Sequence, residues 1–346
     1  MGILLNQNNH RPLRVKTGSL AIRCVLGVVG LLALSAPPAL HAEEEDIVPA
    51  GVLRWEVEVR HDAQQKAYSR EDTTSPMLHY LVPDLTVRSQ LSGSVSRKYQ
   101  ISTLRLGLGI SDHWNLALDI DHGTAVQSST VQATTTDPAA VQAAADLTSR
   151  EVSGLGDFSL WSLHRTVYGD YNGFVTGFGF VYPLSKQEGP WLGQNALTVS
   201  SFTPGLLGVI HFTHYYATVP ARFEFRLRFN YGLFKRVTLP DGTSAKLRTG
   251  NHLALNTGWR QEFGPVHLGM SLLGRYLTPS KLDGISQHDP RNELATRVEF
   301  GAGNLNMLEQ GPLSFPFKML LWAEHSWRGF NTPVRNELGL SFTSYF

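Results

Sequence analysis

The residues with the clearest chemical potential are charged side chains spaced two apart. Within Arg222–Leu233, Glu224, Arg226 and Arg228 alternate with large apolar residues. A period of two places the charges on one face of a β-strand and the apolar side chains on the other. Charges that line a passage through a low-dielectric frame focus the electric field and orient a polar solute. This segment therefore predicts electrostatic guidance of a solute.

Other segments repeat this alternation, so a set of charged residues can be collected that shares one side. The strongest candidates are Glu56, Glu58, Asp119, Asp121, Arg226, Arg228, Arg260, Arg275, Arg297 and Glu337. In lipid each would cost about 2–4 kcal/mol near the bilayer midplane, so we expect all ten inside a barrel. They either make structural ion pairs in a narrow interior or line a wet path for a small solute.

Metal and cofactor sites are not predicted. His211 and His214 would align on a helix, but on a strand they point to opposite faces. We expect His252 and His267 to be polar lining near opposite membrane edges. The single cysteine, Cys24, lies near the N-terminus, so the rest of the chain offers no disulfide or thiolate metal site.

An enzyme is the rival interpretation, because some barrels of this size hydrolyse lipids. Ser162 and His164 share a side, but no acid of matching position accompanies them. Ser344 and His325 fall at opposite ends of neighbouring strands. We therefore expect no enzyme, and keep an outer-membrane lipid-modifying hydrolase as the alternative.

The elements that would carry the charged residues are strands long enough to cross a bilayer, which takes roughly 9–11 residues. One uninterrupted pattern covers Arg222–Leu233 and similar patterns recur along the chain, which predicts a transmembrane antiparallel up-and-down β-barrel, all-β, with twelve strands. The other strands are expected at Val52–Arg60, Arg97–Ile110, Trp114–Asp121, Gly156–Val167, Phe174–Tyr182, a segment ending near Ala217, His252–Gln261, Val266–Leu277, Leu294–Gly303, Phe317–Trp327 and Asn336–Phe346.

The connections alternate between long and short, which is typical of outer-membrane barrels with long extracellular loops and short periplasmic turns. Fourteen strands are the alternative, if Met77–Val82 and Leu85–Leu91 form a hairpin. A change of parity near Ser102–Thr103 suggests a bulge. The Thr/Ala/Gln-rich segment 123–152 is expected to be an extracellular loop that makes few contacts.

The N-terminal 42 residues have the features of a secretory signal peptide. Four basic residues and no acidic residue precede or flank the apolar run Val25–Leu34, and Ala42 supplies a small residue before Glu43. We therefore expect a signal peptide at 1–42, a periplasmic N-terminal segment at 43–51 and a barrel at 52–346. Cleavage would take those four from the chain's 30 Lys+Arg, against 29 Asp+Glu, leaving about −3. Such a balance argues against a nucleic-acid partner.

The C-terminal strand points to two partners. Asn336–Phe346 alternates and ends in Tyr345-Phe346, which resembles the signal read by the barrel-assembly machinery of the bacterial outer membrane. The apolar side of every strand predicts outer-membrane lipid as the second partner.

Two motifs resemble a known family. Ser-Gly-Leu-Gly-Asp-Phe-Ser-Leu at Ser153–Leu160 and the hairpin Leu106–Leu118 are similar to segments of the MetA-pathway phenol-degradation family of outer-membrane transporters. The resemblance implies a channel for small solutes, small aromatic or hydrophobic compounds among them, and brings no catalytic residues or cofactor. A structural, non-conducting barrel is a further alternative.

Overall fold

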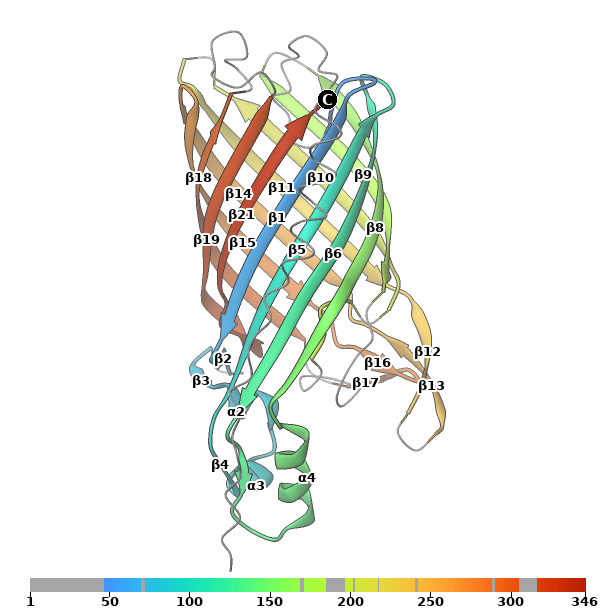
Figure 1. The fold of residues 1–346 in the computed structure, drawn as a ribbon, viewed down its shortest axis with the longest axis vertical. Coiled ribbons are helices and arrows are strands. Elements are labelled where there is room, and N and C mark those ends of the chain that lie inside the picture. Colours follow the sequence, from blue (N-terminus) through green and yellow to red (C-terminus); the bar gives the residue numbers. More distant parts are fainter. Residues whose placement is uncertain are drawn as a thin grey trace, which may run out of the picture. The chain divides into compact units, whose positions relative to one another are not determined.

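A closed antiparallel barrel dominates the computed structural model, which describes residues 47–69, 72–168, 171–184, 197–201, 203–216, 218–239, 242–287, 290–304 and 316–346 (Figure 1). Neighbouring strands follow the order β1-β21-β19-β18-β15-β14-β11-β10-β9-β8-β6-β5, and β5 pairs with β1 to close the ring. The barrel strands are β1 (Leu53–Gln64), β5 (Val95–Gly109), β6 (Trp114–Ser129), β8 (Arg150–Tyr168), β9 (Asn172–Pro183), β10 (Gly205–Tyr215), β11 (Ala221–Gly232), β14 (His252–Phe263), β15 (Val266–Leu277), β18 (Arg291–Gly303), β19 (Phe317–Phe330) and β21 (Asn336–Tyr345).

Twelve strands therefore form the barrel, as the alternating pattern predicted, and the fold class is confirmed. The outer surface carries exposed apolar side chains from every side of the ring, for example Phe178, Phe229, Met270, Val298 and Leu338. An exposed apolar band around a closed sheet is the arrangement that suits a barrel in lipid, because closure leaves no strand edge unpaired. None of the described helices is long and apolar enough to cross a membrane.

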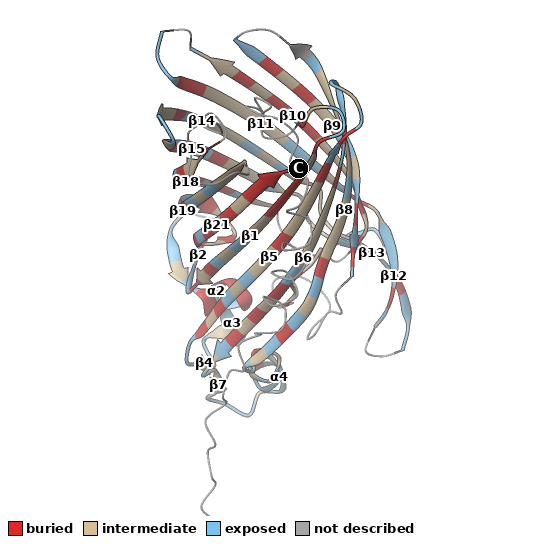
Figure 2. Ribbon diagram, turned by 45° about the horizontal axis from the view of Figure 1, so that its top comes forward, coloured by how far each residue is buried: buried red, intermediate tan, exposed pale blue. Residues whose placement is uncertain are grey.

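The two ends of the barrel differ. At one end, here called the terminal end, lie Leu53 and Tyr345 and short connections such as 110–113 and 264–265. At the other, the loop end, strands run on into extensions (Figures 1 and 2). The extension elements are β2 (Lys66–Tyr68), β3 (Thr74–Pro76), α2 (Met77–Leu81), α3 (Leu85–Arg88), β4 (Leu91–Ser92), β7 (Gln132–Ala133), α4 (Pro138–Asp146), β12 (Phe234–Thr238), β13 (Ser244–Arg248), β16 (Lys281–Leu282), β17 (Ile285–Ser286) and β20 (Thr332–Pro333).

The fourteen-strand alternative is wrong, because Met77–Leu81 and Leu85–Arg88 form the helices α2 and α3 and not a hairpin. In α2, Met77, Leu78, Tyr80 and Leu81 are buried in a cluster with residues of β2 and β5. Asp84 then caps α3, because its side chain accepts hydrogen bonds from the backbone N–H groups of Thr86 and Val87. Apolar residues at helical spacing thus pack over the loop end and do not extend the sheet.

Segment 123–152 is also more ordered than a loop that makes few contacts. β6 runs to Ser129, β8 begins at Arg150, and α4 lies between them. Asp137 accepts a hydrogen bond from Ala139 N and Pro138 occupies the first turn of α4, both common features of helix starts. Leu147 is fully buried with the α2 cluster, so this extension packs against the first one.

The expected bulge near Ser102–Thr103 is absent from the described pairing, which is continuous from Val95 to Gly109. The sequence suggests a change of parity because, in this half of β5, the apolar residues Tyr99 and Ile101 face inward while the polar residues Lys98, Gln100 and Ser102 face outward. Irregular register occurs instead between Ile120 and His122 of β6. The apolar-outward rule fails here because this half of β5 lies near the extensions, where the outer face need not be apolar.

Candidate solute path through the barrel

A cavity of about 560 Å³ runs inside the barrel, and all ten charged residues expected to face inward line it. They come from seven described strands: Glu56 and Glu58 on β1, Asp119 and Asp121 on β6, Arg226 and Arg228 on β11, Arg260 on β14, Arg275 on β15, Arg297 on β18 and Glu337 on β21. Their placement agrees with the alternation of each strand. Whether they touch a passing solute stays a prediction.

On the β1–β5–β6 side, charges form a connected group near the terminal half of the cavity. Arg105 Nε donates to Asp119 Oδ1 at 2.8 Å, and its Nη1 lies 3.3 Å from Glu56 Oε1. Arg54 Nη2 lies 2.6 Å from the other oxygen of Glu56. Glu56 is opposite Arg105 and Arg105 is opposite Asp119 in the register, while Arg54 lies two residues before Glu56 on β1, so the sheet itself brings them together.

On the other side of the barrel, Arg260 of β14 and Glu299 of β18 form an ion pair across β15, the strand between them. Arg260 of β14 is opposite Gly269 of β15, which is opposite Glu299 of β18. The guanidinium Nη2 lies 2.6 Å from Glu299 Oε1. A Cβ at Gly269 would come within 2.5 Å of Glu299 Cγ, so only glycine leaves room for this bridge.

Glu324 on β19 is the centre of a second group. Its side chain is fully buried, and its two oxygens lie 2.5 Å from Arg275 Nη1 and 2.9 Å from Arg297 Nη2. Arg297 also stacks over Trp322, with 4.0 Å between guanidinium carbon and ring centroid. Trp322 fits because its neighbour on β21 is Gly339, where a Cβ would overlap the indole.

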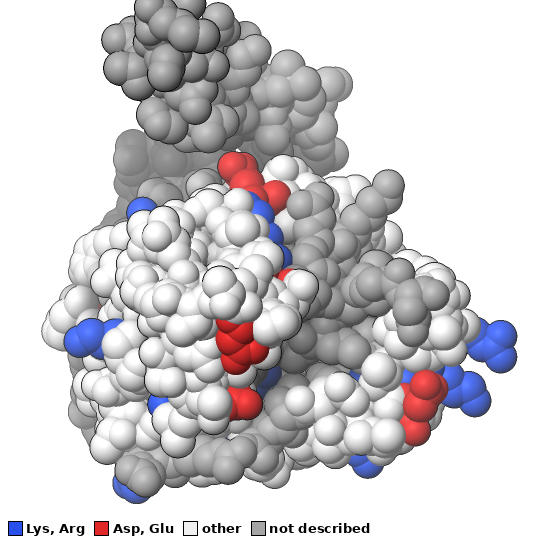
Figure 3. All heavy atoms as spheres, turned by 90° about the horizontal axis from the view of Figure 1, so that it is seen from below, with Lys and Arg blue, Asp and Glu red and all other residues white. Residues whose placement is uncertain are grey.

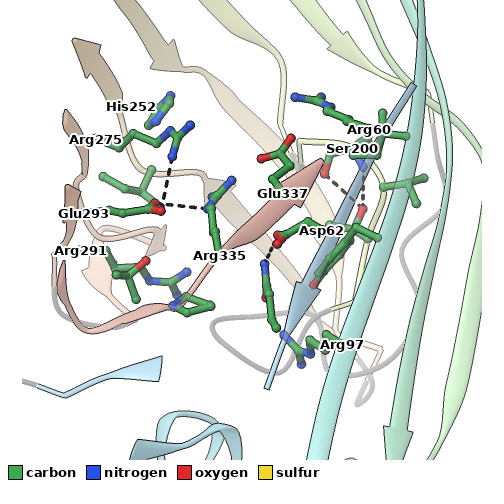
Figure 4. Close-up of a pocket in the computed structure, with 18 of the residues that line it drawn as sticks. Arg60, Asp62, Arg97, Ser200, His252, Arg275, Arg291, Glu293, Arg335 and Glu337 are labelled. Atoms are coloured by element: carbon green, nitrogen blue, oxygen red, sulfur yellow. Dashed lines mark hydrogen bonds and ion pairs between the residues drawn. The ribbon is translucent and has the colours of Figure 1, made fainter. Parts of the chain in front are cut away.

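A second cavity of about 430 Å³ lies at the loop end (Figure 4). Seven residues line both cavities, and we call them the shared ring: Arg60, Asp121, Asp157, His252, Arg275, Arg335 and Glu337. The carboxylates of the ring come from β6, β8 and β21, which lie on one side of the barrel. His252 and Arg275 come from β14 and β15 on the other. Arg60 on β1 and Arg335 just before β21 lie on the same side as the carboxylates, so a solute that moves between the cavities would meet both signs of charge there and only His252 and Arg275 on the other side.

Two acids of the shared ring, Asp121 and Asp157, accept hydrogen bonds from neutral donors. Thr103 Oγ1 donates to Asp121 Oδ1 at 2.6 Å. Ser201 donates its backbone N–H and its hydroxyl to Asp157, at 2.9 and 3.0 Å. Ser201 belongs to 197–201, a segment that folds onto the inner face of β6 and β8, where Val199 packs against Ala125 and Val152. These hydrogen bonds orient the carboxylates without cancelling their charge.

The cavity at the loop end, which we call the outer cavity to distinguish it from the main cavity of about 560 Å³, contains residues that the alternation does not identify. Arg335, just before β21, lies 3.2 Å from Glu293 Oε2, and this carboxylate holds the pKa of the Arg335 guanidinium above its usual range. Arg291 lies over the ring of Tyr80, 5.6 Å from its centroid. Burial raises the pKa of the Tyr80 phenol, so it stays protonated. Tyr80 and Arg335 lie outside the barrel strands, where alternation gives no signal.

Part of the N-terminal segment closes on the terminal end. Ile47 and Val48 are 1% exposed, and Val48 packs with Val52 and Tyr345. The Asn115 side-chain amide donates to Val48 O at 3.1 Å and accepts from Val48 N at 2.6 Å. Asn115 lies on the inner face of β6, so residues 47–51 lie within the mouth of the barrel. Residues 43–46 of the expected segment, and the expected signal peptide at 1–42, are outside the described residues.

The candidate metal and catalytic residues remain apart. His211 faces the interior, with its Nδ1 3.3 Å from Arg226 Nη2, while His214 Nδ1 lies 2.8 Å from Asn172 Oδ1 outside. Within the described ranges, no group of three or more His, Cys, Asp or Glu side chains could hold a metal.

Of the serine–histidine candidates, His325 and Ser344 lie at opposite ends of their strands. His325 is opposite Asn336 near the loop end, whereas Ser344 is opposite Phe317 near the terminal end, as expected. His164 packs against Trp114 with its Nδ1 3.3 Å from Thr166 Oγ1.

Comparison with known proteins shows the fold. No family model matches the sequence, and no curated protein matches it either, so the resemblance to the phenol-degradation family stays a hypothesis. The crystal structure of the COG4313 outer membrane channel from Pseudomonas putida F1 superposes with a TM-score of 0.63 at 14% identity, covering 90% of this chain and all of that one. The translocator domain of autotransporter NalP from Neisseria meningitidis gives 0.43 at 10% identity, with coverage of 94% and 95%. The CymD monoaromatic hydrocarbon channel gives 0.38 at 7% identity, with coverage of 86% and 89%. The chain thus has the closed twelve-strand architecture of bacterial outer-membrane barrels, and channels are among its structural neighbours.

Proposed function

We propose that the protein is a channel of the bacterial outer membrane that lets small solutes cross through its charged interior. The observation that carries the proposal is the pair of polar cavities joined by the shared ring inside a closed, apolar-surfaced barrel. Acidic and basic side chains are nearly balanced along both cavities. A nearly balanced interior favours orientation of a polar or dipolar solute over strong selection by net charge.

Small aromatic compounds are the solutes favoured by the motif resemblance. Tyr80 and Tyr99 lie along the outer cavity and Trp161 along the main cavity, so ring faces are present in both. Trp161 projects inward because Gly179 on the neighbouring strand leaves space for its indole. Aromatic side chains offer stacking surfaces to planar solutes while the surrounding arginines remain available to polar substituents.

The orientation follows from the same proposal. Short connections at the terminal end would face the periplasm and the extensions at the loop end would face the exterior. Strand β21 presents Leu338, Leu340 and Phe342 outward, which supports its use as the signal for the barrel-assembly machinery. The chain would reach the periplasm through the expected signal peptide.

Substituted-cysteine block of conductance tests the channel. The mature chain would lack cysteine, so Arg60→Cys in the shared ring and Val59→Cys on the adjacent outward position form a matched pair. In planar bilayers we expect discrete conductance steps, and a charged methanethiosulfonate reagent should lower them in Arg60→Cys alone. A folded barrel with no steps would favour the structural, non-conducting alternative. Equal block of both variants would remove the shared ring from the path.

A further inference from the structure

A small sheet outside the barrel carries an unusual concentration of positive charge on one face. The strands β12, β13, β16 and β17 pair in that order at the loop end. Arg236 is opposite Lys246, and Arg248 is opposite Lys281, so all four cations share a face. We call it the basic face. Like charges directly opposite one another destabilise a sheet, and an anion bound between them would relieve this repulsion.

The opposite face holds the sheet together. Val237, Ala245 and Leu247 are buried there, with Leu239 and Leu282 packed against them. Apart from Arg248, the cations of the basic face therefore have no packing role. Arg236, Lys246 and Lys281 are exposed and make no ion pair with the described residues. Asp283, in the turn between β16 and β17, uses its carboxylate to accept the Lys246 backbone N–H.

The position of Arg248 shows which way the basic face points. Its Nε donates to Gly232 O at the end of β11, and its guanidinium lies 4.2 Å from the centroid of Tyr231. Tyr231 is an outward residue, as are Tyr276 and Trp327 near the loop ends of their strands. Aromatic side chains at strand ends mark the headgroup level of a membrane barrel. The basic face is thus continuous with the lipid-facing surface at that level.

The surface view is consistent with this placement. In Figure 3, Lys and Arg side chains lie at the right-hand edge, with acidic side chains beside them, on the side where β12 and β13 project in Figure 1. Phe234 shares the basic face, opposite Arg248, and is 60% exposed. An exposed aromatic ring among guanidinium and ammonium groups suits a partner that has both a phosphate and an apolar part.

We propose that the basic face binds the phosphate groups of an acylated glycolipid of the outer leaflet, with the apolar part against Phe234 and the barrel. Arginine and lysine are the usual partners of phosphate, and cationic residues at a membrane surface attract anionic headgroups. The inference rests on the proposed outer-membrane location and does not depend on which solute passes.

Lipid binding by the purified full barrel tests the inference. The variant Arg236→Ser/Lys246→Ser/Lys281→Ser removes three charges and keeps Arg248, which anchors the sheet. Native mass spectrometry in a zwitterionic detergent, titrated with diphosphoryl lipid A, should show binding about 100-fold weaker than in the unmodified protein. Lys235→Ser is the matched control, because Lys235 is exposed on the same strand but belongs to the other face.

The outcomes separate this inference from the channel. Heat-modifiability on gels should show that both variants fold, and the triple variant should conduct as the unmodified barrel does. Dephosphorylated lipid A should bind weakly to every variant. Equal affinity of the triple variant and the unmodified protein for diphosphoryl lipid A would overturn the inference. Displacement of the lipid by inorganic phosphate at similar concentration would also overturn it, since the site would then recognise free phosphate.

Discussion

The two sides of the barrel interior handle their charges differently. On the β14–β19 side, Arg260, Arg275 and Arg297 each lie within 3 Å of a carboxylate oxygen. On the β6–β8 side, Asp121 and Asp157 are held by hydroxyl and backbone donors. The arginine charges of the β14–β19 side are therefore largely neutralised by neighbouring carboxylates, whereas Asp121 and Asp157 on the β6–β8 side are held by uncharged donors.

This difference changes how the interior field should be understood. Without partners, the inward arginines of β11, β14 and β15 would form a positive side of the interior. The structure shows that two of them, Arg260 and Arg275, are engaged with Glu299, Glu324 and Glu293. The shared ring itself carries three acids, Asp121, Asp157 and Glu337, together with the arginines Arg60, Arg275 and Arg335. Buried ion pairs stabilise the barrel only while both partners are present.

The largest effect should come from removing the acid that serves two arginines. Glu324→Gln leaves Arg275 and Arg297 with one carboxylate fewer, at a position whose side chain is fully buried. Losing one member of a buried pair costs about 3–5 kcal/mol, so we expect the free energy of unfolding in urea to fall by that amount. The midpoint of the urea transition, followed by tryptophan fluorescence in phospholipid vesicles, measures it.

Glu58→Gln supplies the comparison within the same cavity. Glu58 also faces inward, on β1, but is half-buried and makes no ion pair with the described residues. Its replacement should change stability by less than about 1 kcal/mol. Similar losses in both variants would mean that the two sides do not differ in how they use charge.

A smaller but still substantial effect is expected on the outer face. Phe225→Arg or Leu227→Arg places a guanidinium in lipid and should cost about 2–4 kcal/mol near the midplane. Arg226→Leu, on the residue between them, removes a charge from the interior instead. Heat-modifiability gels should show poor assembly of the first two variants and good assembly of the third. Equal tolerance would contradict the assignment of inward and outward residues.

Alternation was enough to predict the barrel because the odd or even position of a residue along its strand decides whether its side chain faces lipid or the interior, and charged residues are tolerated only in the interior. Arg222–Leu233 illustrates this, since β11 has almost the same bounds and the expected inward set. The rule applies only where one face meets lipid. Beyond that band, in the loop-end halves of β5 and β6, polar residues face outward and the pattern weakens. The 77–91 helices and the extended β6 were missed for that reason.

The candidate site was predicted in part. The ten charged residues could be placed inside, but which of them pair depends on the register between strands, and no local pattern encodes it. Gly269 shows this, because its importance appears only when Arg260 and Glu299 are seen on either side. Arg335 and Ser201 come from connections, where no alternation exists, and Trp322 is uncharged, so the pattern of inward charges does not identify any of the three. By contrast, the start of α4 had a readable signal in Asp137-Pro138 and the alanines that follow.

Neutralising the ring acids should change selectivity more than stability. In Asp121→Asn with Asp157→Asn, the side-chain oxygen can still accept from Thr103 or Ser201, so we expect each change to cost about 1 kcal/mol or less. Loss of two negative charges should shift the reversal potential in a KCl gradient toward anions. Glu151→Gln is the control, since Glu151 is exposed on β8 and lines neither cavity. An unchanged reversal potential in the double variant would place the ring acids off the path.

The smallest effect is expected from the arginines of β11. Arg226 Nη2 lies 3.3 Å from His211 Nδ1, and Arg226 and Arg228 both line the main cavity but not the cavity at the loop end. Arg226→Glu with Arg228→Glu should move the reversal potential toward cations, because the interior loses two positive charges and gains two negative ones. The shift should be modest, because the main cavity is larger and carries many other charges. Lys235→Glu with Arg236→Glu makes the same charge change outside the barrel and should leave selectivity unaltered. If the β11 variant conducts and its reversal potential matches that of this control, then Arg226 and Arg228 do not line the route that ions take.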